Sequence, residues 1–241
     1  MAQSLGRLIP PGQSAFFRYL LLFVFMFVIG SGPARADILT VDAMTGNDPT
    51  DWINSLIIPQ FDPTTGTLNS IKFTLEGTVD GDVSLENLGG SPATINSTLQ
   101  APINATLPVL GILTVSPSSG RSDMLAAFDG TNDFGGTSGV SAQPVTPATL
   151  TDMIGPSANA ALLALFTGVG NVNIPVEADG MASASAPGGA IFVSQFLTRA
   201  KAKLIVDYDF TPAGPVVPEP WTVFLLGSGL LGVGVLRRRM A

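Results

Sequence analysis

The sequence predicts an all-β protein, an antiparallel β-sandwich of about eight to ten strands with one or two short helices. Three observations predict this class. Polar and apolar residues alternate with period two in several short stretches from residue 67 onward, as they do in half-buried strands. Gly, Pro, Asn or Asp bounds each stretch, as expected for turns. Segments with helical periodicity are few, which favours a sandwich.

The most regular strand pattern lies at 199–210. Most of its odd positions are charged, and its even positions are apolar: Ala200, Ala202, Leu204, Val206, Tyr208 and Phe210. Successive side chains of a strand point to opposite faces. The even residues, including Tyr208, are therefore expected to lie in a core.

Shorter stretches predict the preceding strands. Apolar odd positions predict strands at 71–76 and 83–86, with Asp80–Gly81–Asp82 as a turn before the second. At 171–178 the even positions are apolar, and Pro175, which has no N–H to donate, predicts an edge strand or a bulge. Weaker patterns predict further strands at 93–99, 103–109, 111–115 and 190–196.

Helical signal is confined to one region of the chain. The segments 149–153 and 157–166 each predict a short helix. In the second, Leu162, Leu163 and Phe166 fall on a common face, which is the side expected to pack against the sheets.

Composition limits the possible chemistry. The chain contains no cysteine and no histidine, which excludes disulfides, thiolate metal sites, cysteine nucleophiles and Ser-His-Asp catalysis. Residues 37–216 have the length of one domain and carry 17 acidic residues against five basic ones, a net charge of −12. Such an acidic domain repels phosphate backbones, so nucleic acid is not an expected partner. No cofactor is expected.

Residues 1–36 have the pattern of a cleavable signal peptide. Basic residues precede an apolar run at 19–29, which suits the helix of a signal sequence and is too short to span a bilayer. Ala34 and Ala36 supply the small residues that signal peptidase recognises, which predicts cleavage before Asp37. The export machinery and signal peptidase are therefore expected partners.

Residues 217–241 predict a membrane-anchoring tail. The motif 217–220 contains Pro218, Glu219 and Pro220, and the uncharged segment 221–236 that follows predicts a transmembrane helix. The tail ends in a basic cluster of Arg237, Arg238 and Arg239. By the positive-inside rule this cluster stays cytoplasmic, so the domain before the helix is expected to face outward.

This order of proline motif, glycine-interrupted apolar helix and arginine cluster resembles the PEP-CTERM sorting signal. In that family the tail is recognised by an exosortase, a membrane cysteine transpeptidase that cleaves near the triplet. The resemblance implies that Pro218, Glu219 and Pro220 of this chain are recognised as part of a substrate. It also implies cell-envelope or exopolysaccharide-associated biology.

Several stretches of the domain also resemble the choice-of-anchor E domain of secreted bacterial proteins. The matching stretches are Ile58-Pro59-Gln60-Phe61-Asp62-Pro63 followed by Gly66-Thr67-Leu68, Phe128-Asp129-Gly130-Thr131 with Asp133-Phe134-Gly135-Gly136-Thr137-Ser138-Gly139, and Phe166-Thr167-Gly168 with Gly170. Domains so named are defined by alternative C-terminal surface anchors and carry no established activity. The resemblance therefore implies a location and leaves the function open.

One loop concentrates potential oxygen ligands. Asp129, Asn132 and Asp133 lie within five residues and are candidate calcium ligands. The loop is not an EF-hand, because Phe134 stands where that motif requires glycine. The alternative interpretation is that these side chains cap turns. The stretch from Asp42 to Asp51 presents the same two alternatives.

Other candidate residues concern carbohydrate. A glycosidase requires two carboxylates that face each other across a cleft, but Glu76, Glu86 and Glu177 are each expected on the solvated side of a strand. Trp52 is the only tryptophan of the domain. It is either an exposed platform for a sugar ring or, near Phe61, a core residue.

The expected function is that of a non-enzymatic exported protein of the cell surface or extracellular matrix. The C-terminal helix is expected to anchor it in the membrane before processing, after which the domain is attached or released. The alternative is a calcium-dependent or carbohydrate-binding extracellular module.

Overall fold

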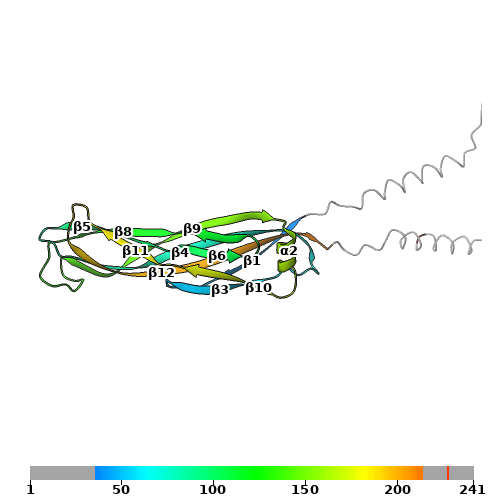
Figure 1. Cartoon of the computed structure of the whole chain (residues 1–241), viewed down its shortest axis with the longest axis horizontal. Helices are drawn as coiled ribbons and strands as arrows, with labels where there is room; N and C mark the ends of the chain where they lie inside the picture. Colours follow the sequence, from blue (N-terminus) through cyan, green and yellow to red (C-terminus); the bar gives the residue numbers. More distant parts are fainter. Residues whose placement is uncertain (1–35, 214–226, 228–241) are drawn as a thin grey trace, which may run out of the picture. The chain divides into compact units, whose positions relative to one another are not determined.

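The computed structural model describes residues 36–213 and Gly227. These residues form an all-β protein (Figure 1). Its strands are β1 (Asp37–Met44), β2 (Asp48–Pro49), β3 (Trp52–Pro59), β4 (Gly66–Asn87), β5 (Ala93–Gln100), β6 (Ile103–Leu107), β7 (Gly111–Val115), β8 (Ser118–Leu125), β9 (Gly139–Ser157), β10 (Asn171–Ala178), β11 (Met181–Ser185) and β12 (Phe192–Pro212). A single helix with described bounds, α2 (Ala160–Phe166), joins β9 to β10.

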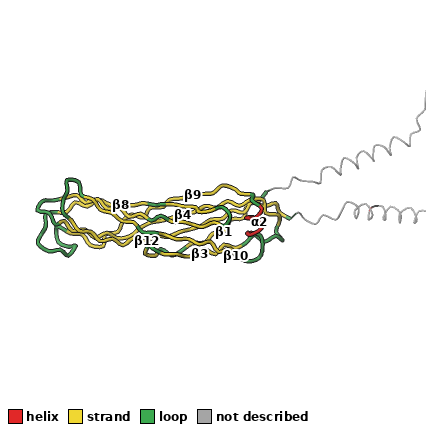
Figure 2. The backbone as a smooth tube through the Cα atoms, viewed as in Figure 1, coloured by secondary structure: helices red, strands yellow, loops and turns green. Residues whose placement is uncertain are grey.

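The strands form three antiparallel sheets (Figure 2). The long sheet has the order β1-β12-β4-β9, with β2 also paired to β12. The two short sheets, β3-β10-β6-β7 and β11-β5-β8, cover one face of the long sheet. The predicted sandwich is therefore observed, as one long layer against two short ones.

The pairing of β4 with β12 extends along the whole long sheet. The two strands have 22 and 21 residues, and their ladder runs from Asn87↔Phe192 at one end to Gly66↔Pro212 at the other. At ~3.3 Å per residue this ladder spans roughly 70 Å. The odd side chains of β4 from Ile71 to Leu85 and the even side chains of β12 from Thr198 to Tyr208 are buried.

Strands 71–76 and 83–86 are parts of the single strand β4, so the turn predicted at Asp80–Gly81–Asp82 is wrong. Gly81 instead lies opposite Thr198 with a φ of 150°. A Cβ on Gly81 would overlap the carbonyl oxygen of Leu197 and approach Leu99 of β5. The glycine therefore permits a close approach of β12 and of the short sheet, rather than a reversal of the chain.

The two predicted helices have different outcomes. The segment 149–153 is part of β9, where Thr149 pairs with Thr78 and their hydroxyl oxygens lie 2.9 Å apart. Threonine fits a strand well, and this long-range pairing outweighs a short helical pattern. The segment 157–166 contains α2, whose first turn is capped by the side chain of Asn159.

Most of the other predicted strands are observed within a few residues. The segments 111–115 and 171–178 match β7 and β10, and 199–210 lies inside β12. The edge position predicted from Pro175 is wrong for the strand, because β10 lies between β3 and β6. Pairing with β6 begins only at Val176, however, so Pro175 itself has a partner strand on one side.

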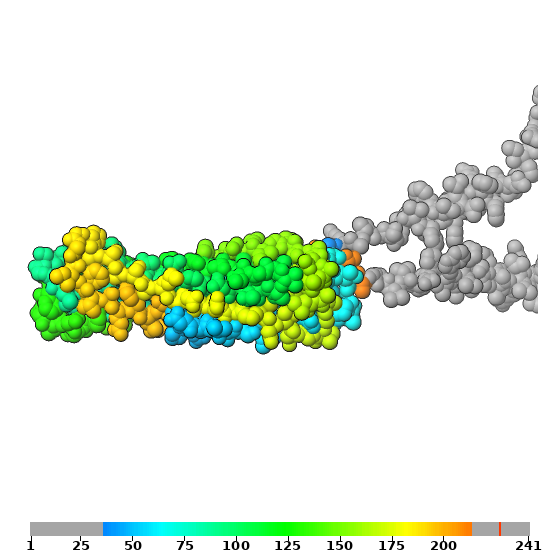
Figure 3. Space-filling model, in the orientation of Figure 1, coloured from blue at the N-terminus to red at the C-terminus, as the bar shows by residue number. Residues whose placement is uncertain are grey.

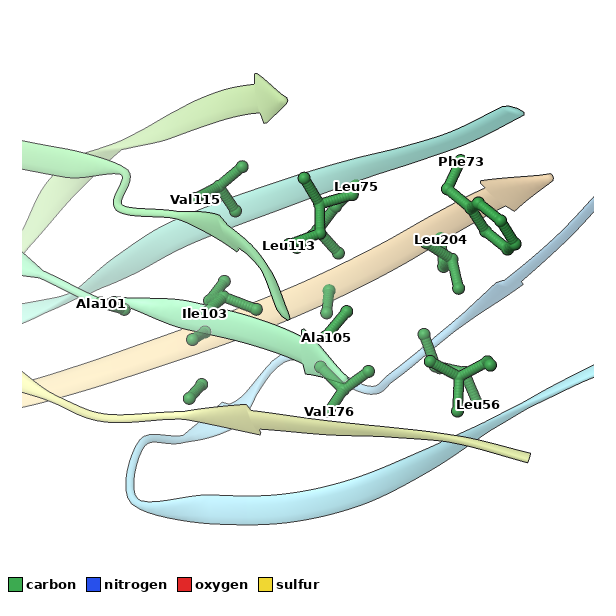
Figure 4. Packing of buried hydrophobic residues seen from close by; sticks show 14 of the residues in the cluster. Leu56, Phe73, Leu75, Ala101, Ile103, Ala105, Leu113, Val115, Val176 and Leu204 are labelled. Carbon is green, nitrogen blue, oxygen red and sulfur yellow. The ribbon is translucent and has the colours of Figure 1, made fainter. Parts of the chain in front are cut away.

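The core lies between the long sheet and the short ones. Phe73 and Leu75 of β4 and Leu204 of β12 are fully buried on the inner face of the long sheet (Figure 4). Opposite them lie the buried side chains Leu56, Ile103, Leu113, Val115 and Val176 (Figure 4). Burial of these apolar surfaces supplies the main stabilisation of the fold.

An aromatic cluster closes the end of the sandwich that contains α2. Phe166 of α2 packs edge-on against Phe73, with ring centroids 5.4 Å apart, and Phe61 lies 5.1 Å from Phe210. Tyr208 lies between them, fully buried as its register predicts, and donates a hydrogen bond of 2.7 Å to the carbonyl of Pro59. Burial raises the pKa of the Tyr208 hydroxyl above its ordinary value.

The outer face of the long sheet carries cross-strand ion pairs. Lys72 lies 2.7 Å from Asp207, and its hydrogen bond holds the pKa of Asp207 below the ordinary value. Arg199 lies 3.1 Å from Asp82 on the same face. All four side chains are partly exposed, so each pair contributes about 1 kcal/mol or less.

We expect Tyr208→Phe to lower the free energy of unfolding by about 0.5 to 1.5 kcal/mol, the net contribution of one hydrogen bond. The substitution keeps the ring in the aromatic cluster and removes the buried hydroxyl that donates to the carbonyl of Pro59. Urea unfolding followed by fluorescence measures the change. A loss below about 0.5 kcal/mol would mean that the hydroxyl contributes nothing to stability.

Candidate functional site

Three loops gather at the end of the described domain opposite α2, and we call them the tip (Figure 3). They are the loop 88–92 after β4, the loop 126–138 between β8 and β9, and the loop 186–191 before β12. Both ends of the described domain lie at the other end, because Asp37 pairs with Phe210. The tip is therefore the part of the sandwich farthest from the points where the chain enters and leaves it.

Asn87 holds the tip loops together from below. It is fully buried, and its Nδ2 donates to the carbonyl oxygens of Ser91 and Ala126, at 2.9 and 2.6 Å. The backbone N–H of Leu88 donates to the carbonyl of Ile191. One buried amide and one backbone bond thus connect all three loops.

Glu86 precedes Asn87 and is also fully buried. The prediction of a solvated carboxylate is therefore wrong. Glu86 does belong to the outer face of β4, but the loop 126–138 covers this end of the face. Its Oε1 accepts a hydrogen bond of 2.5 Å from the hydroxyl of Ser138, whereas its Oε2 has no hydrogen-bond partner among the described residues.

The candidate ligands Asp129, Asn132 and Asp133 lie exposed in the loop 126–138. Asp129 Oδ1 accepts hydrogen bonds from the backbone N–H and the hydroxyl of Thr131, and these bonds hold the pKa of Asp129 below its ordinary value. Asp133 Oδ1 accepts from the backbone N–H of Gly135 at 2.9 Å. The two aspartates thus cap turns, as the alternative interpretation predicts.

Ser138 connects this acidic loop to Glu86. Its hydroxyl donates to Glu86 and also accepts a hydrogen bond of 3.3 Å from the backbone N–H of Asp129. Ser138 is itself fully buried. The buried carboxylate and the exposed aspartates therefore belong to one hydrogen-bonded unit.

A shallow hollow of about 580 Å³ lies beside this unit, between residues 89–94 and 187–191. Glycine, proline, serine, alanine, threonine and isoleucine line it, and its lining includes no charged side chain. It therefore offers backbone groups and small side chains to a ligand, and no catalytic group.

The three glutamates considered for glycoside hydrolysis lie in separate places. Glu76 lies on the outer face of β4, opposite Lys203. Glu177 is exposed on β10, where its Oε1 accepts a hydrogen bond of 3.1 Å from Asn104. Glu86 lies at the tip, ten residues along β4 from Glu76. No two of these glutamates face each other across a cleft.

The acidic stretch from Asp42 to Asp51 does not converge on one point. Asp42 Oδ2 lies 3.6 Å from Lys203 Nζ, and Asn47 donates a hydrogen bond of 2.8 Å to Asp80. Asp51 accepts from the backbone N–H of Gly180. Each side chain thus has a different structural partner.

Trp52 is half-buried and packs against the core, whereas Phe61 is fully buried beyond the other end of β3. Its indole nitrogen is buried, and no described residue accepts a hydrogen bond from it. Trp52 therefore does not stand out from the surface as a platform for a sugar ring.

Residues 36–213 contain no group of three or more acidic side chains close enough to share a metal ion. Within the same part of the chain, no helix has the length and apolar character needed to cross a membrane. Several predicted site residues lie outside the described residues: Ala34, Pro218, Glu219, Pro220, Arg237, Arg238 and Arg239. Ala36 and Asp37 are described, and Asp37 begins β1.

No family model and no curated protein matches the chain. Among solved structures, a chain of Desmodium yellow mottle tymovirus is 7% identical, with 90% of this chain and 94% of that chain covered and a TM-score of 0.21. Chains of infectious bursal disease virus strains Gt and Gx are 14% and 15% identical over 83% and 85% of this chain, covering 51% and 53% of theirs, with TM-scores of 0.10. Such scores support no functional inference.

The pairing of Glu86 with Ser138 is the feature of the tip that sequence reasoning misses. One signal is present: the apolar alternation of β4 stops at Leu85, and the polar pair Glu86 and Asn87 follows. The burial of those residues depends on Ala126, 39 residues from Asn87, and on Ser138, 52 residues from Glu86. Composition near Glu86 does not reveal these contacts.

We expect Ser138→Ala to destabilise the protein by about 1 to 3 kcal/mol, because buried Glu86 loses its hydrogen-bond donor. Denaturant unfolding measures the effect. The exposed Ser141 provides a matched control, since Ser141→Ala is expected to change stability by less than about 0.5 kcal/mol. Equal effects of the two substitutions would contradict a structural role for the buried pair.

Proposed function

We propose that this chain is a non-enzymatic exported protein of the cell surface or extracellular matrix. In this proposal residues 1–36 direct export, and the motif 217–220 is the recognition sequence for a membrane exosortase. The segment 221–236 holds the chain in the membrane until it is processed, with Arg237–Arg239 on the cytoplasmic side. The observation that carries the proposal is the order of these signals at the two ends of an acidic β-domain.

The position of the first strand supports the proposed cleavage site. Cleavage before Asp37 removes no residue of β1, whose ladder with β12 begins at the Asp37↔Phe210 pair. A cut a few residues later would remove part of an eight-residue strand from the edge of the long sheet. The proposed mature chain therefore starts at the first residue of β1.

The path of the chain supports a role in which the tip loops are held away from the membrane. The end of β12 and α2 lie at one end of the domain, and the tip loops lie at the other. A domain attached through the chain that follows Ala213 would hold its tip roughly 60 to 70 Å from the attachment point, given a rise of ~3.3 Å per residue. We propose that contacts with the extracellular matrix, including exopolysaccharide, are made away from the membrane.

The absence of histidine and cysteine from the sequence supports a role without catalysis. The separation of Glu76, Glu86 and Glu177 agrees with it, because glycoside hydrolysis requires a carboxylate pair. The alternative of a calcium-dependent module has one specific observation in its favour, the buried carboxylate of Glu86.

Coexpression with a membrane exosortase tests the proposal. We expect the mature protein to begin at Asp37 and to lack the segment 221–241, whereas without the enzyme the C-terminal segment is retained. Intact-mass spectrometry of the purified protein distinguishes the two forms. Replacement of Pro218, Glu219 and Pro220 by alanine is expected to abolish processing.

Pro215→Ala serves as the control, because it changes a proline just upstream of the motif and should leave processing intact. A chain that still ends at Ala241 in the presence of active enzyme would refute the sorting proposal. A chain that keeps Met1 after expression in an exporting host would refute the signal peptide.

A further inference from the structure

The carboxylate of Glu86 has no role in the proposed sorting and display. The side chain is fully buried, and its Oε2 is without a hydrogen-bond partner in the described part of the chain. Its Oε1 has one donor, the hydroxyl of Ser138. Burial of a carboxylate with one oxygen unpartnered is unfavourable unless a positive group compensates it.

The basic side chains of the domain do not provide that group. Four of the five form ion pairs with acidic residues outside the loop 126–138: Lys72 with Asp207, Arg121 with Asp123, Arg199 with Asp82, and Lys203 with Asp42. The fifth, Lys201, lies opposite Thr78 in the middle of the long sheet. The ion pairs found between residues 36 and 213 therefore leave Glu86 uncompensated.

Glu86 Oε2 points at the underside of the acidic loop. A Cβ placed on Gly139 would overlap Oε2, and it would also overlap the backbone of Phe134 and Gly135. Oε2 and the turn capped by Asp133 thus approach Gly139 together. The unpartnered oxygen is aimed into the loop that carries the exposed aspartates.

The two aspartates border the same glycine-rich segment. A Cβ on Gly136 would overlap Asp129 Oδ2, and a Cβ on Gly135 would lie 3.0 Å from Asp133 Oδ1. Three carboxylates therefore approach residues 135–139, where the missing glycine side chains leave room for them. One of the three is buried, which distinguishes this arrangement from a solvated acidic surface.

We propose that the tip binds a calcium ion through Glu86, with Asp129 and Asp133 closing on it from the loop above. The available donors are all oxygens: three carboxylates, the Ser138 hydroxyl and loop carbonyls, which suit calcium with its six to eight flexible oxygen ligands. Magnesium requires a smaller and more regular octahedron. Since residues 36–213 contain no three acidic groups already within reach of one ion, the loop 126–138 moves inward when calcium binds.

Such a site would make the shape of the tip depend on calcium. Extracellular calcium modules typically have dissociation constants of about 10⁻⁴ to 10⁻³ M. A site that must close on its ion belongs in this range, because part of the binding free energy is used to move the loop 126–138. The inference is independent of the sorting tail and stands if that proposal fails.

Thermal unfolding of the purified full-length chain in calcium chloride tests the inference. We expect the midpoint to rise by about 3 to 5 °C at a calcium concentration ten times the dissociation constant, and less in magnesium chloride. Glu86→Gln keeps the size of the side chain and an acceptor for Ser138. This variant is expected to lose the calcium-dependent shift and the binding heat in calorimetry.

Asp62 provides a matched control for Asp129. Its Oδ1 accepts from the backbone N–H and the hydroxyl of Thr64 in the same turn geometry, but it lies at the opposite end of the domain. We expect Asp129→Asn to weaken calcium binding at least tenfold, as loss of one charged ligand does, and Asp62→Asn to leave it unchanged.

Two results would overturn the inference: a wild-type chain whose midpoint does not respond to calcium, or a Glu86→Gln variant that retains the wild-type response. If Glu86→Gln does not fold, the combined Asp129→Asn and Asp133→Asn variant decides, because both residues are exposed. A full calcium response in that variant would equally overturn it, and a lost response would support it.

Discussion

The antiparallel pairing of β4 with β12 is the constraint on which the rest of the structure depends. Alternate side chains of both strands are buried along most of its length, so a slip by one residue would carry every core side chain to the solvent face. The register holds with a single irregularity, between Asp209 and Phe210. The strands β1 and β9 attach to the outer edges of this pair, and the two short sheets cover its inner face.

The parts of the fold that the sequence predicts well are those where one face is apolar and the other polar. The segments of β7, β10 and most of β12 follow this rule. The strand β1 does not follow it. Its adjacent residues Ile38 and Leu39 point to opposite faces, and both are exposed, at 66% and 41%. The break predicted within β4 has another cause: Asp80–Gly81–Asp82 has the composition of a turn, and only the neighbouring strand β12 reveals why glycine is required there.

The candidate site likewise has a part that the sequence predicts and a part that it does not. The acidic loop is visible in the sequence, since its aspartates and glycines are consecutive, and the turn caps made by Asp129 and Asp133 are local interactions. The contact between Glu86 and Ser138 joins residues 52 positions apart. This contact forms because β8 and β9 place the loop between them over the end of β4. It therefore depends on the fold of the whole sandwich. Strand alternation alone places Glu86 in water, whereas the fold buries it.

The geometry of β12 determines how the domain would respond to mechanical tension. The strand ends at Pro212, beside the entry of the chain at Asp37, and runs from there along the full length of its ladder with β4. A pull on that end, opposed by a restraint at the tip, acts along the strand axis. It would load the hydrogen bonds between β4 and β12 simultaneously, in shear, whereas a pull across the sheet would break them one after another. A strand that begins at the tip and leaves at the opposite end is therefore suited to transmit force between the two.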